Sequence, residues 1–168
     1  DLKDVDIEVF GIEPGFLEAE LSKRWQIDVV GKAFGVIKLH GIPIDVSVPR
    51  RERKTGAGHS DFVIDADPTM SVAEAALRRD FTINAIYYDP IKEVWVDPYN
   101  GRQAILNKLL DPVSDRFRED SLRVLRGMQF IARFDLTPTL WCLDMCRELS
   151  QDNLPKEDRK STRLNSSH

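Results

Sequence analysis

Apolar and acidic residues alternate strictly from Asp4 to Phe10, near the start of the chain. This period of two predicts a half-buried β-strand whose carboxylates share the face opposite to its apolar side chains. Apolar runs at residues 27–30, 34–39 and 42–48 predict three further strands. Between the first two strands, residues 14–25 carry apolar positions at helical spacing behind a proline, which predicts a short amphipathic helix.

The rest of the chain predicts helices joined by short segments. Residues 50–70 are polar and contain glycines, which predicts a long loop. The sequence Ser71-Val-Ala-Glu74 is a capping box and predicts a helix that continues to about Arg79. The elements predicted after it are a helix at 81–86, a strand at 94–96, a turn at 97–101, and helices at 103–108, 119–134 and 138–149. This order predicts an α+β fold, in which a small mixed sheet with helices is followed by an all-helical part.

Composition narrows the class of protein. The 168 residues are 42% hydrophobic and 31% charged, which is typical of a soluble globular protein. No apolar run approaches the roughly 20 residues of a transmembrane helix, so no membrane partner is predicted. Cys142 and Cys146 lie four residues apart in a helical pattern, which favours a reducing cytoplasm over a disulfide scaffold. The formal net charge of −4 disfavours coating of nucleic acid by bulk charge but allows a local basic groove.

Two carboxylates on the first predicted strand are candidates for metal chemistry. Asp4 and Asp6 share a face, roughly 6–7 Å apart along the chain. Such a pair can bind Mg²⁺, which takes oxygen ligands together with substrate phosphates and supports phosphoryl transfer. Asp45, alone among apolar neighbours on a later strand, is a candidate third ligand. A solvated acidic face on an edge strand is the alternative that the spacing also allows.

Basic and polar residues gather between two predicted helices. Arg78 and Arg79 offer forked donors that suit phosphate oxygens. Asp80 can cap the next helix or accept a hydrogen bond from a ribose hydroxyl, and Asn84 lies four residues later on the same face. A basic helix end followed by an Asp cap explains the same residues, so both interpretations stay open.

A third candidate cluster lies on the long predicted helix. Glu119, Asp120 and Arg123 occupy positions i, i+1 and i+4, so Arg123 is expected to reach both carboxylates across one turn, with Arg126 a turn further on. A carboxylate beside a guanidinium presents acceptors and donors that can pair with the base edge of cytosine or adenine. An ordinary helical salt bridge is the alternative.

Together these motifs resemble those of one family. The segments that carry the resemblance are Asp4-x-Asp6, Arg78-Arg-Asp-Phe-Thr-Ile-Asn-Ala85, Asp97-Pro-Tyr-Asn-Gly101 and Glu119-Asp-x-x-Arg123-x-x-Arg126. In this order and spacing they are similar to the bacterial and eukaryotic CCA-adding enzymes, which are tRNA nucleotidyltransferases, and to bacterial poly(A) polymerases. The resemblance implies a polymerase-β-like nucleotidyltransferase head over residues 1–111 and the start of a helical neck over 112–150. The polar, aperiodic composition at the end of the chain predicts a disordered or non-native tail over 151–168.

The resemblance also implies a reaction and a set of site residues. A tRNA 3′-hydroxyl would attack the α-phosphate of CTP or ATP and release pyrophosphate. Asp4 and Asp6 would be catalytic ligands of Mg²⁺, and Asp45 would be a further catalytic carboxylate. Asp120 and Arg123 would form the amino-acid template that pairs with C or A, with Glu119 orienting Arg123. The residues that the resemblance assigns to nucleotide binding are Arg78, Arg79, Asp80, Asn84, Glu119, Asp120, Arg123 and Arg126.

The resemblance also implies binding partners and leaves alternative functions open. The tRNA 3′ end, CTP and ATP are the implied partners, and no stable protein partner is implied. Relatives carry a Gly-Gly phosphate-binding segment upstream of the matching acidic pair and further domains downstream, so these 168 residues alone are expected to be inactive or severely impaired. The shared motifs do not separate CCA addition from poly(A), C-only or A-only addition. A non-catalytic RNA-binding remnant of the same fold is the alternative from another class.

Overall fold

A computed structural model describes residues 4–30, 36–54 and 62–152, with the backbone alone at 52–54, 62–64 and 151–152. The chain divides into two compact units, Asp1–Ala75 and Ala76–His168. Of the tail predicted over 151–168, residues 151 and 152 form the end of a helix, and the rest lies outside the described residues. The predicted boundary between head and neck at residues 111 and 112 stays a prediction.

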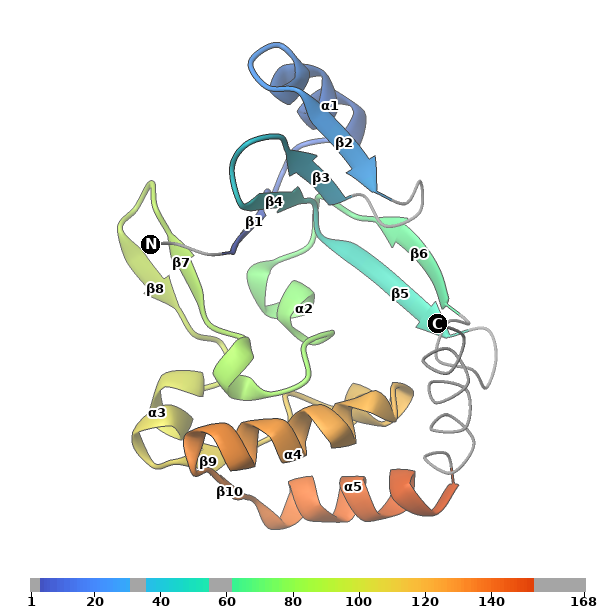
Figure 1. The fold of residues 1–168 in the computed structure, drawn as a ribbon, viewed down its shortest axis with the longest axis vertical. Helices are drawn as coiled ribbons and strands as arrows, with labels where there is room; N and C mark the ends of the chain where they lie inside the picture. The colour runs from blue at the N-terminus through green and yellow to red at the C-terminus, as the bar shows by residue number, and fades with distance from the viewer. Residues whose placement is uncertain (1–3, 31–35, 55–61, 153–168) are drawn as a thin grey trace, which may run out of the picture. The chain divides into compact units, whose positions relative to one another are not determined.

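A four-stranded mixed sheet with one helix forms the first part of the first unit (Figure 1). Its elements are β1 (Val5–Glu8), α1 (Pro14–Ser22), β2 (Ile27–Val30), β3 (Val36–Leu39) and β4 (Ile44–Ser47). The strands lie in the order β1-β4-β3-β2, with β1 parallel to β4 and β3 antiparallel to both of its neighbours. The small mixed sheet expected from the sequence is therefore confirmed.

One face of this sheet forms the core of the first unit. Ile37 of β3 and Val46 of β4 are buried, and they cluster with Leu17 of α1. Because successive side chains of a strand point to opposite faces, the neighbouring Lys38 and Asp45 stand on the other side of the sheet. The alternation that buries the apolar residues thus determines where the charged residues lie.

A β-hairpin occupies part of the segment that was predicted as a loop over residues 50–70. Strand β5 (Arg50–Lys54) pairs antiparallel with β6 (Phe62–Ala66). Arg51 Nε also donates a hydrogen bond to Asp67 Oδ2 at 2.7 Å. The loop prediction is wrong because a run of charged residues has no period of two, and the pairing partner comes later in the chain.

The predicted capping box is confirmed. The backbone N–H of Ser71 donates to Glu74 Oε2 at 2.9 Å, and the backbone N–H of Glu74 donates to Ser71 Oγ at 3.2 Å. These reciprocal bonds satisfy amides that a helix start leaves without partners. Helix α2 begins directly after them and runs over Val72–Ala76, so it ends before the predicted Arg79.

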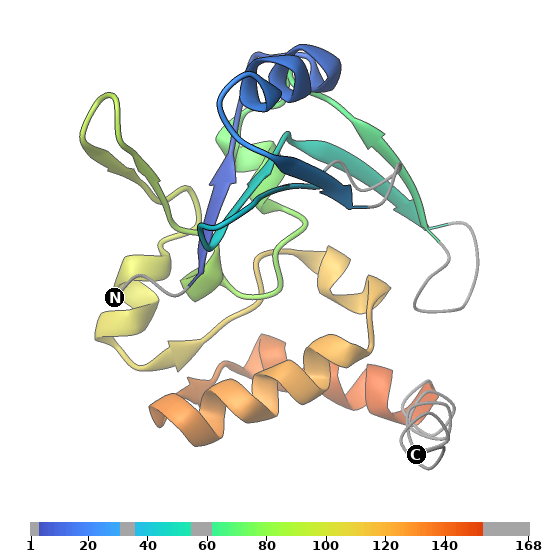
Figure 2. The ribbon, with the colours of Figure 1, turned by 45° about the horizontal axis from the view of Figure 1, so that its top comes forward.

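The second unit combines two long helices with short elements (Figure 2). Its elements are η1 (Thr82–Asn84), β7 (Tyr87–Asp89), β8 (Val94–Val96), α3 (Gly101–Leu106), β9 (Leu109–Leu110), η2 (Asp115–Glu119), α4 (Leu122–Phe134), β10 (Thr137–Pro138) and α5 (Leu140–Asp152). Here η marks a 3₁₀ helix. Of all the helices that the structure describes, none is long and apolar enough to cross a membrane.

Two predicted helices begin or end elsewhere than expected. The helix predicted over 119–134 starts at Leu122, because Asp120 is extended and its Oδ1 accepts a hydrogen bond from the Leu122 backbone N–H at 3.0 Å. Asp residues commonly form such bonds at helix starts in preference to a helical turn. The segment predicted as a helix over 81–86 forms only the 3₁₀ turn η1.

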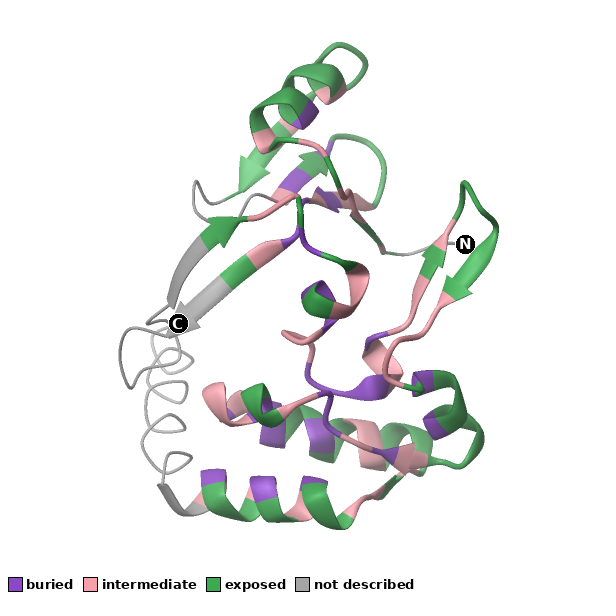
Figure 3. Cartoon of the chain, turned by 180° about the vertical axis from the view of Figure 1, so that it is seen from behind, coloured by how far each residue is buried: buried purple, intermediate pink, exposed green. Residues whose placement is uncertain are grey.

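An aromatic cluster holds the second unit together. Phe81 is fully buried, and its ring meets those of Phe117 and Phe130 edge to face at centroid distances of 5.3 and 5.7 Å. Helix α5 adds a stripe of buried residues, visible as purple bands in Figure 3, at Cys142, Met145 and Leu149. Spacings of three and four residues put these side chains on one face of the helix.

Gly101 supports a specific stability prediction. A Cβ atom at this position would lie 2.1 Å from the backbone oxygen of Thr82 and 2.8 Å from Ile86 Cγ1. Since backbone cannot move aside as a flexible side chain can, Gly101→Ala is expected to lower the free energy of unfolding by about 3 kcal/mol. Urea denaturation followed by circular dichroism measures the change.

Gly15→Ala is the matched control, because a Cβ at Gly15 would meet nothing within 4 Å. This substitution is expected to change the free energy of unfolding by less than about 0.5 kcal/mol. Equal effects of the two substitutions would contradict the close approach at Gly101.

Candidate functional site

A row of charged residues crosses the polar face of the first unit's sheet. Asp6 of β1 is paired in register with Asp45 of β4, and Asp45 is paired in register with Lys38 of β3. Residues paired in register on neighbouring strands point to the same face of a sheet. Two carboxylates and one ammonium group from three strands are thereby brought together, and Asp4, two residues before Asp6, adds a third carboxylate.

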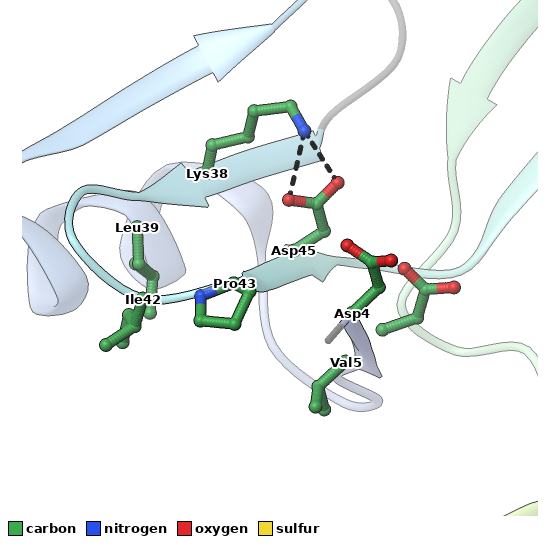
Figure 4. Close-up of a pocket in the computed structure, with 8 residues that line it drawn as sticks. Asp4, Val5, Lys38, Leu39, Ile42, Pro43 and Asp45 are labelled. Atoms are coloured by element: carbon green, nitrogen blue, oxygen red, sulfur yellow. Dashed lines mark hydrogen bonds and ion pairs between the residues drawn. The ribbon is translucent and has the colours of Figure 1, made fainter. Parts of the chain in front are cut away.

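These four side chains line a shallow pocket of about 220 Å³, which Figure 4 shows in close-up. Lys38 Nζ donates to both carboxylate oxygens of Asp45, at 3.1 Å to Oδ1 and 2.9 Å to Oδ2. Apolar residues of the β3–β4 connection, including Ile42 and Pro43, complete the lining. The sequence-predicted residues Asp4, Asp6 and Asp45 therefore line one pocket.

The three carboxylates act electrostatically on Lys38. The hydrogen bond and charge of Asp45 raise the pKa of the Lys38 ammonium, and the charges of Asp4 and Asp6 raise it further. Lys38 therefore carries its positive charge throughout the physiological range. Sequence reasoning missed this residue, although a lone lysine between the buried Ile37 and Leu39 is a signal of the same kind as Asp45.

The donor set of the pocket suits a hard divalent cation. Carboxylate oxygens are the ligands that Mg²⁺ prefers in proteins, and the pocket offers three carboxylates from two neighbouring strands. Within the described part of the chain, however, no three acidic, histidine or cysteine side chains lie close enough to hold one ion together. Asp4 and Asp6 fit a metal in their chemistry, whereas Asp45 is turned towards Lys38.

A second group of predicted residues meets in the second unit, around the buried Asp80. Asp80 Oδ1 accepts from Asn84 Nδ2 at 3.0 Å and from the Phe81 backbone N–H at 2.8 Å, and Oδ2 accepts from Arg126 Nε at 2.7 Å. Burial by itself raises the pKa of Asp80. The hydrogen bonds from Asn84 and Arg126 and the charge of Arg126 outweigh it, and the pKa falls below its usual value. Asp80 is therefore an ionised carboxylate in a protein interior.

The side chain of Arg123 is held by two backbone carbonyls. Its Nη1 donates to the carbonyl oxygen of Arg116, and its Nη2 donates to that of Arg78, both at 2.8 Å. The side chain is 9% exposed. The expected i to i+4 arrangement on one helix is wrong, because helix α4 begins at Leu122, after Glu119 and Asp120.

The guanidinium of Arg79 lies over the ring of Tyr87, with 5.7 Å between Cζ and the ring centroid. Arg126 likewise lies over Phe130, at 6.0 Å. Aromatic faces attract guanidinium groups and restrict their orientation. Together with the bond from Arg123 to the Arg78 carbonyl, these contacts fix the arginine block and helix α4 within one unit.

A mixed sheet with carboxylates gathered on one face, joined to a helical unit, defines the polymerase-β-like nucleotidyltransferase heads. Comparison with protein families supports the same fold class. Residues 1–111 match the family model described as the poly A polymerase head domain, and the chain belongs to this family. The resemblance inferred from the motifs is thereby confirmed.

Relatives and solved structures extend this finding. The chain is 36% identical over 152 residues to the Multifunctional CCA protein of Xylella fastidiosa (strain 9a5c). The match covers 88% of this chain and 35% of that protein. It thus spans about a third of the length of this curated relative. The fold is similar to that of a tRNA nucleotidyltransferase complexed with a primer tRNA and an incoming ATP analog, with a TM-score of 0.70, 23% identity and coverage of 94% of this chain and 44% of that one.

The Bacillus stearothermophilus CCA-adding enzyme in complex with CTP is another match. It has a TM-score of 0.65 and 25% identity, and the match covers 90% of this chain and 35% of that one. Both structures support the α+β, polymerase-β-like fold that the sequence predicted.

The ionised Asp80 makes stability depend on pH in a defined direction. Its folded-state pKa lies below the unfolded value of about 3.9, so its contribution is complete above that pH and is lost as the pH falls through the folded value. Asp80→Asn is expected to cost about 1–3 kcal/mol at pH 6, because a charge-assisted hydrogen bond is lost, and to flatten the decline in stability below about pH 4. Urea unfolding at pH 6 and pH 3 measures both effects.

Asp135→Asn is the matched control. Asp135 also has a lowered pKa, caused by its hydrogen bond with Lys108, but its side chain is 90% exposed. Since solvent screens such a pair, its substitution is expected to have a much smaller effect. Identical acid profiles for the native chain and Asp80→Asn would show that Asp80 is not stabilised as an ion.

Proposed function

We propose that this chain is the catalytic head of a tRNA nucleotidyltransferase that adds C and A to the tRNA 3′ end. The 3′-hydroxyl of the tRNA attacks the α-phosphate of CTP or ATP, and pyrophosphate leaves. The observation that carries the proposal is the gathering of Asp4, Asp6 and Asp45 at one pocket in a member of the poly A polymerase head domain family. The reaction would take place in the cytoplasm, which the two unpaired cysteines of the chain favour.

The substrates are inferred from the proteins that this chain resembles. The similar structures include one complexed with a primer tRNA and an incoming ATP analog, and one in complex with CTP. The curated relatives carry the name Multifunctional CCA protein. These names support tRNA as acceptor and CTP and ATP as donors for the protein that contains this head.

The paired carboxylates of the first strand are the proposed metal ligands. Asp4 and Asp6 would hold Mg²⁺, which when bound activates the attacking hydroxyl and stabilises the leaving oxygen. Asp45 lies beside Asp6 in register and adds negative charge at the same pocket. Its carboxylate, oriented by Lys38, would accept the proton of the attacking 3′-hydroxyl or would serve as a further ligand of the metal.

The nucleotide would be held by the network around Asp80. A carboxylate offers about four lone-pair sites, and Asp80 uses three of them for Phe81, Asn84 and Arg126. One acceptor site is therefore left for a ribose hydroxyl. Arg126 donates through Nε to Asp80, which leaves its two terminal nitrogens for the nucleotide.

The arginine block and the template residues complete the nucleotide site. Arg78 and Arg79 would bind the triphosphate through their forked donors. Arg123 is anchored on two backbone carbonyls, which would hold its remaining donors towards the base. Asp120 would accept from the exocyclic amine that cytosine and adenine share, with Glu119 assisting.

Addition of A alone is the second candidate function. The family model is described as a poly A polymerase head domain, so a homopolymeric A tail is an alternative product of the same chemistry. Both candidates need the same carboxylates, and they differ in their use of CTP.

The carboxylate pair gives a direct test of the metal chemistry. Asp6→Asn, in the complete reading frame that encodes this chain, is expected to reduce Mg²⁺-dependent nucleotide transfer to tRNA by at least about 1,000-fold, because a ligand of the catalytic ion is lost. Asp28→Asn is the matched control. Asp28 lies on β2 of the same sheet, is 65% exposed and pairs with His40, so transfer should stay within twofold of the native rate, a margin of about 0.4 kcal/mol. Normal transfer by Asp6→Asn would contradict the proposal.

Base selection gives a separate test. Asp120→Ala is expected to reduce the preference for CTP and ATP over GTP and UTP by at least about tenfold, since one carboxylate–amine pair contributes about 1–3 kcal/mol of discrimination. Competition between the four nucleotides in a single reaction measures the preference. Asp115→Ala serves as control, because that exposed carboxylate bonds to Arg118 on η2. Unchanged selectivity in Asp120→Ala would overturn the template assignment.

A further inference from the structure

Lys38 occupies the place of a cation in the carboxylate pocket. Its Nζ lies 2.9 and 3.1 Å from the two oxygens of Asp45, and the side chain comes from β3, the strand next to Asp45 on the side away from Asp6. Figure 4 shows the two bonds and the neighbouring Asp4 carboxylate. One lone pair on each Asp45 oxygen is therefore already engaged by an ammonium group.

We propose that Lys38 is a positioning residue that competes with divalent metal for Asp45 and thereby keeps the pocket's affinity for free metal low. The proposal rests on the proposed function, because it takes Asp4, Asp6 and Asp45 as the metal-binding carboxylates. It explains why the three carboxylates line one pocket while no three such side chains in the described residues are close enough to hold one ion.

The physical argument concerns charge. Three carboxylates at one pocket repel each other, and the Lys38 ammonium offsets one of the three negative charges. A divalent ion that enters must share the Asp45 carboxylate with Lys38 and must bear the repulsion of a neighbouring positive charge. That repulsion scales with the product of the charges, so it acts twice as strongly on Mg²⁺ as on a monovalent ion.

Lys38 is well suited to a competing role because it is not part of the core. Its side chain is 53% exposed, and that of Asp45 is 38% exposed. An exposed ion pair of this kind contributes little to folding. The pair can therefore open when a metal arrives, and the stability of the sheet continues to depend on the apolar face around Ile37 and Val46.

The consequence for the reaction is that metal binds together with the nucleotide rather than before it. If the pocket has a low affinity for free metal, it is occupied mainly when a nucleoside triphosphate is bound. The triphosphate supplies negative phosphate oxygens to the same ion. Lys38 and the ion would then share the Asp45 carboxylate, since each of its oxygens has two lone pairs. Metal occupancy is thereby linked to the presence of nucleotide.

Direct metal binding tests the proposal without measuring activity. Mn²⁺ titrations of the 168-residue chain, followed by electron paramagnetic resonance of the free ion and without nucleotide, compare the native chain with Lys38→Met and Lys38→Arg. Lys38→Met removes the charge and keeps the apolar stem, so Mn²⁺ is expected to bind at least about threefold more tightly. Lys38→Arg keeps the charge and is expected to stay within about twofold of the native affinity.

Two controls separate this inference from the proposed function. Thermal unfolding by circular dichroism checks that each variant is folded, and Asp6→Asn checks that Mn²⁺ binds at the pocket. Tighter binding in Lys38→Met, abolished by adding Asp6→Asn, supports the proposal. Equal or weaker binding in Lys38→Met, with native binding that Asp6→Asn abolishes, overturns the inference alone. Absence of pocket binding in every variant overturns the metal assignment and the inference with it.

Discussion

The polar row of the sheet depends on the two-residue period of strands β3 and β4. The register that buries Ile37 and Val46 against α1 also turns Lys38 and Asp45 to the opposite face, where Asp6 of β1 joins them. A slip of one residue would exchange the two faces and put the charges into the core, at a cost that no ion pair could offset. Formation of the core and assembly of the carboxylate pocket are therefore one event.

In the second unit the corresponding element is the ionised Asp80. A buried carboxylate is costly unless donors surround it, and Asn84, Arg126 and the Phe81 amide supply them. Phe81, the residue directly after it, lies at the centre of the aromatic cluster. Asp80 and Asn84 thus adjoin the buried aromatic cluster, which favours fixed positions over adaptable ones.

Local patterns predicted much of this architecture, and long-range pairing accounts for what they missed. The alternating β1 segment and the Ser71–Glu74 capping box were recognisable because their signals lie within a few residues. The β5–β6 hairpin was missed because charged residues became strand only through a partner later in the chain. Arg123 was expected to bond along its own helix, but it bonds to the carbonyl of Arg78, 45 residues away in sequence. Lys38 gained its significance only from the register with Asp45.

The activity proposed for this head is the transfer of C and then A to tRNA. The most direct measurement supplies the protein encoded by the complete reading frame with tRNAs ending before CCA, after C and after CC. CTP alone, ATP alone or both nucleotides are added, and the products are resolved at single-nucleotide length. Stepwise addition of C, C and A, which then stops, is the expected result. A homopolymeric A tail, or no extension of any of the three tRNAs, would contradict it.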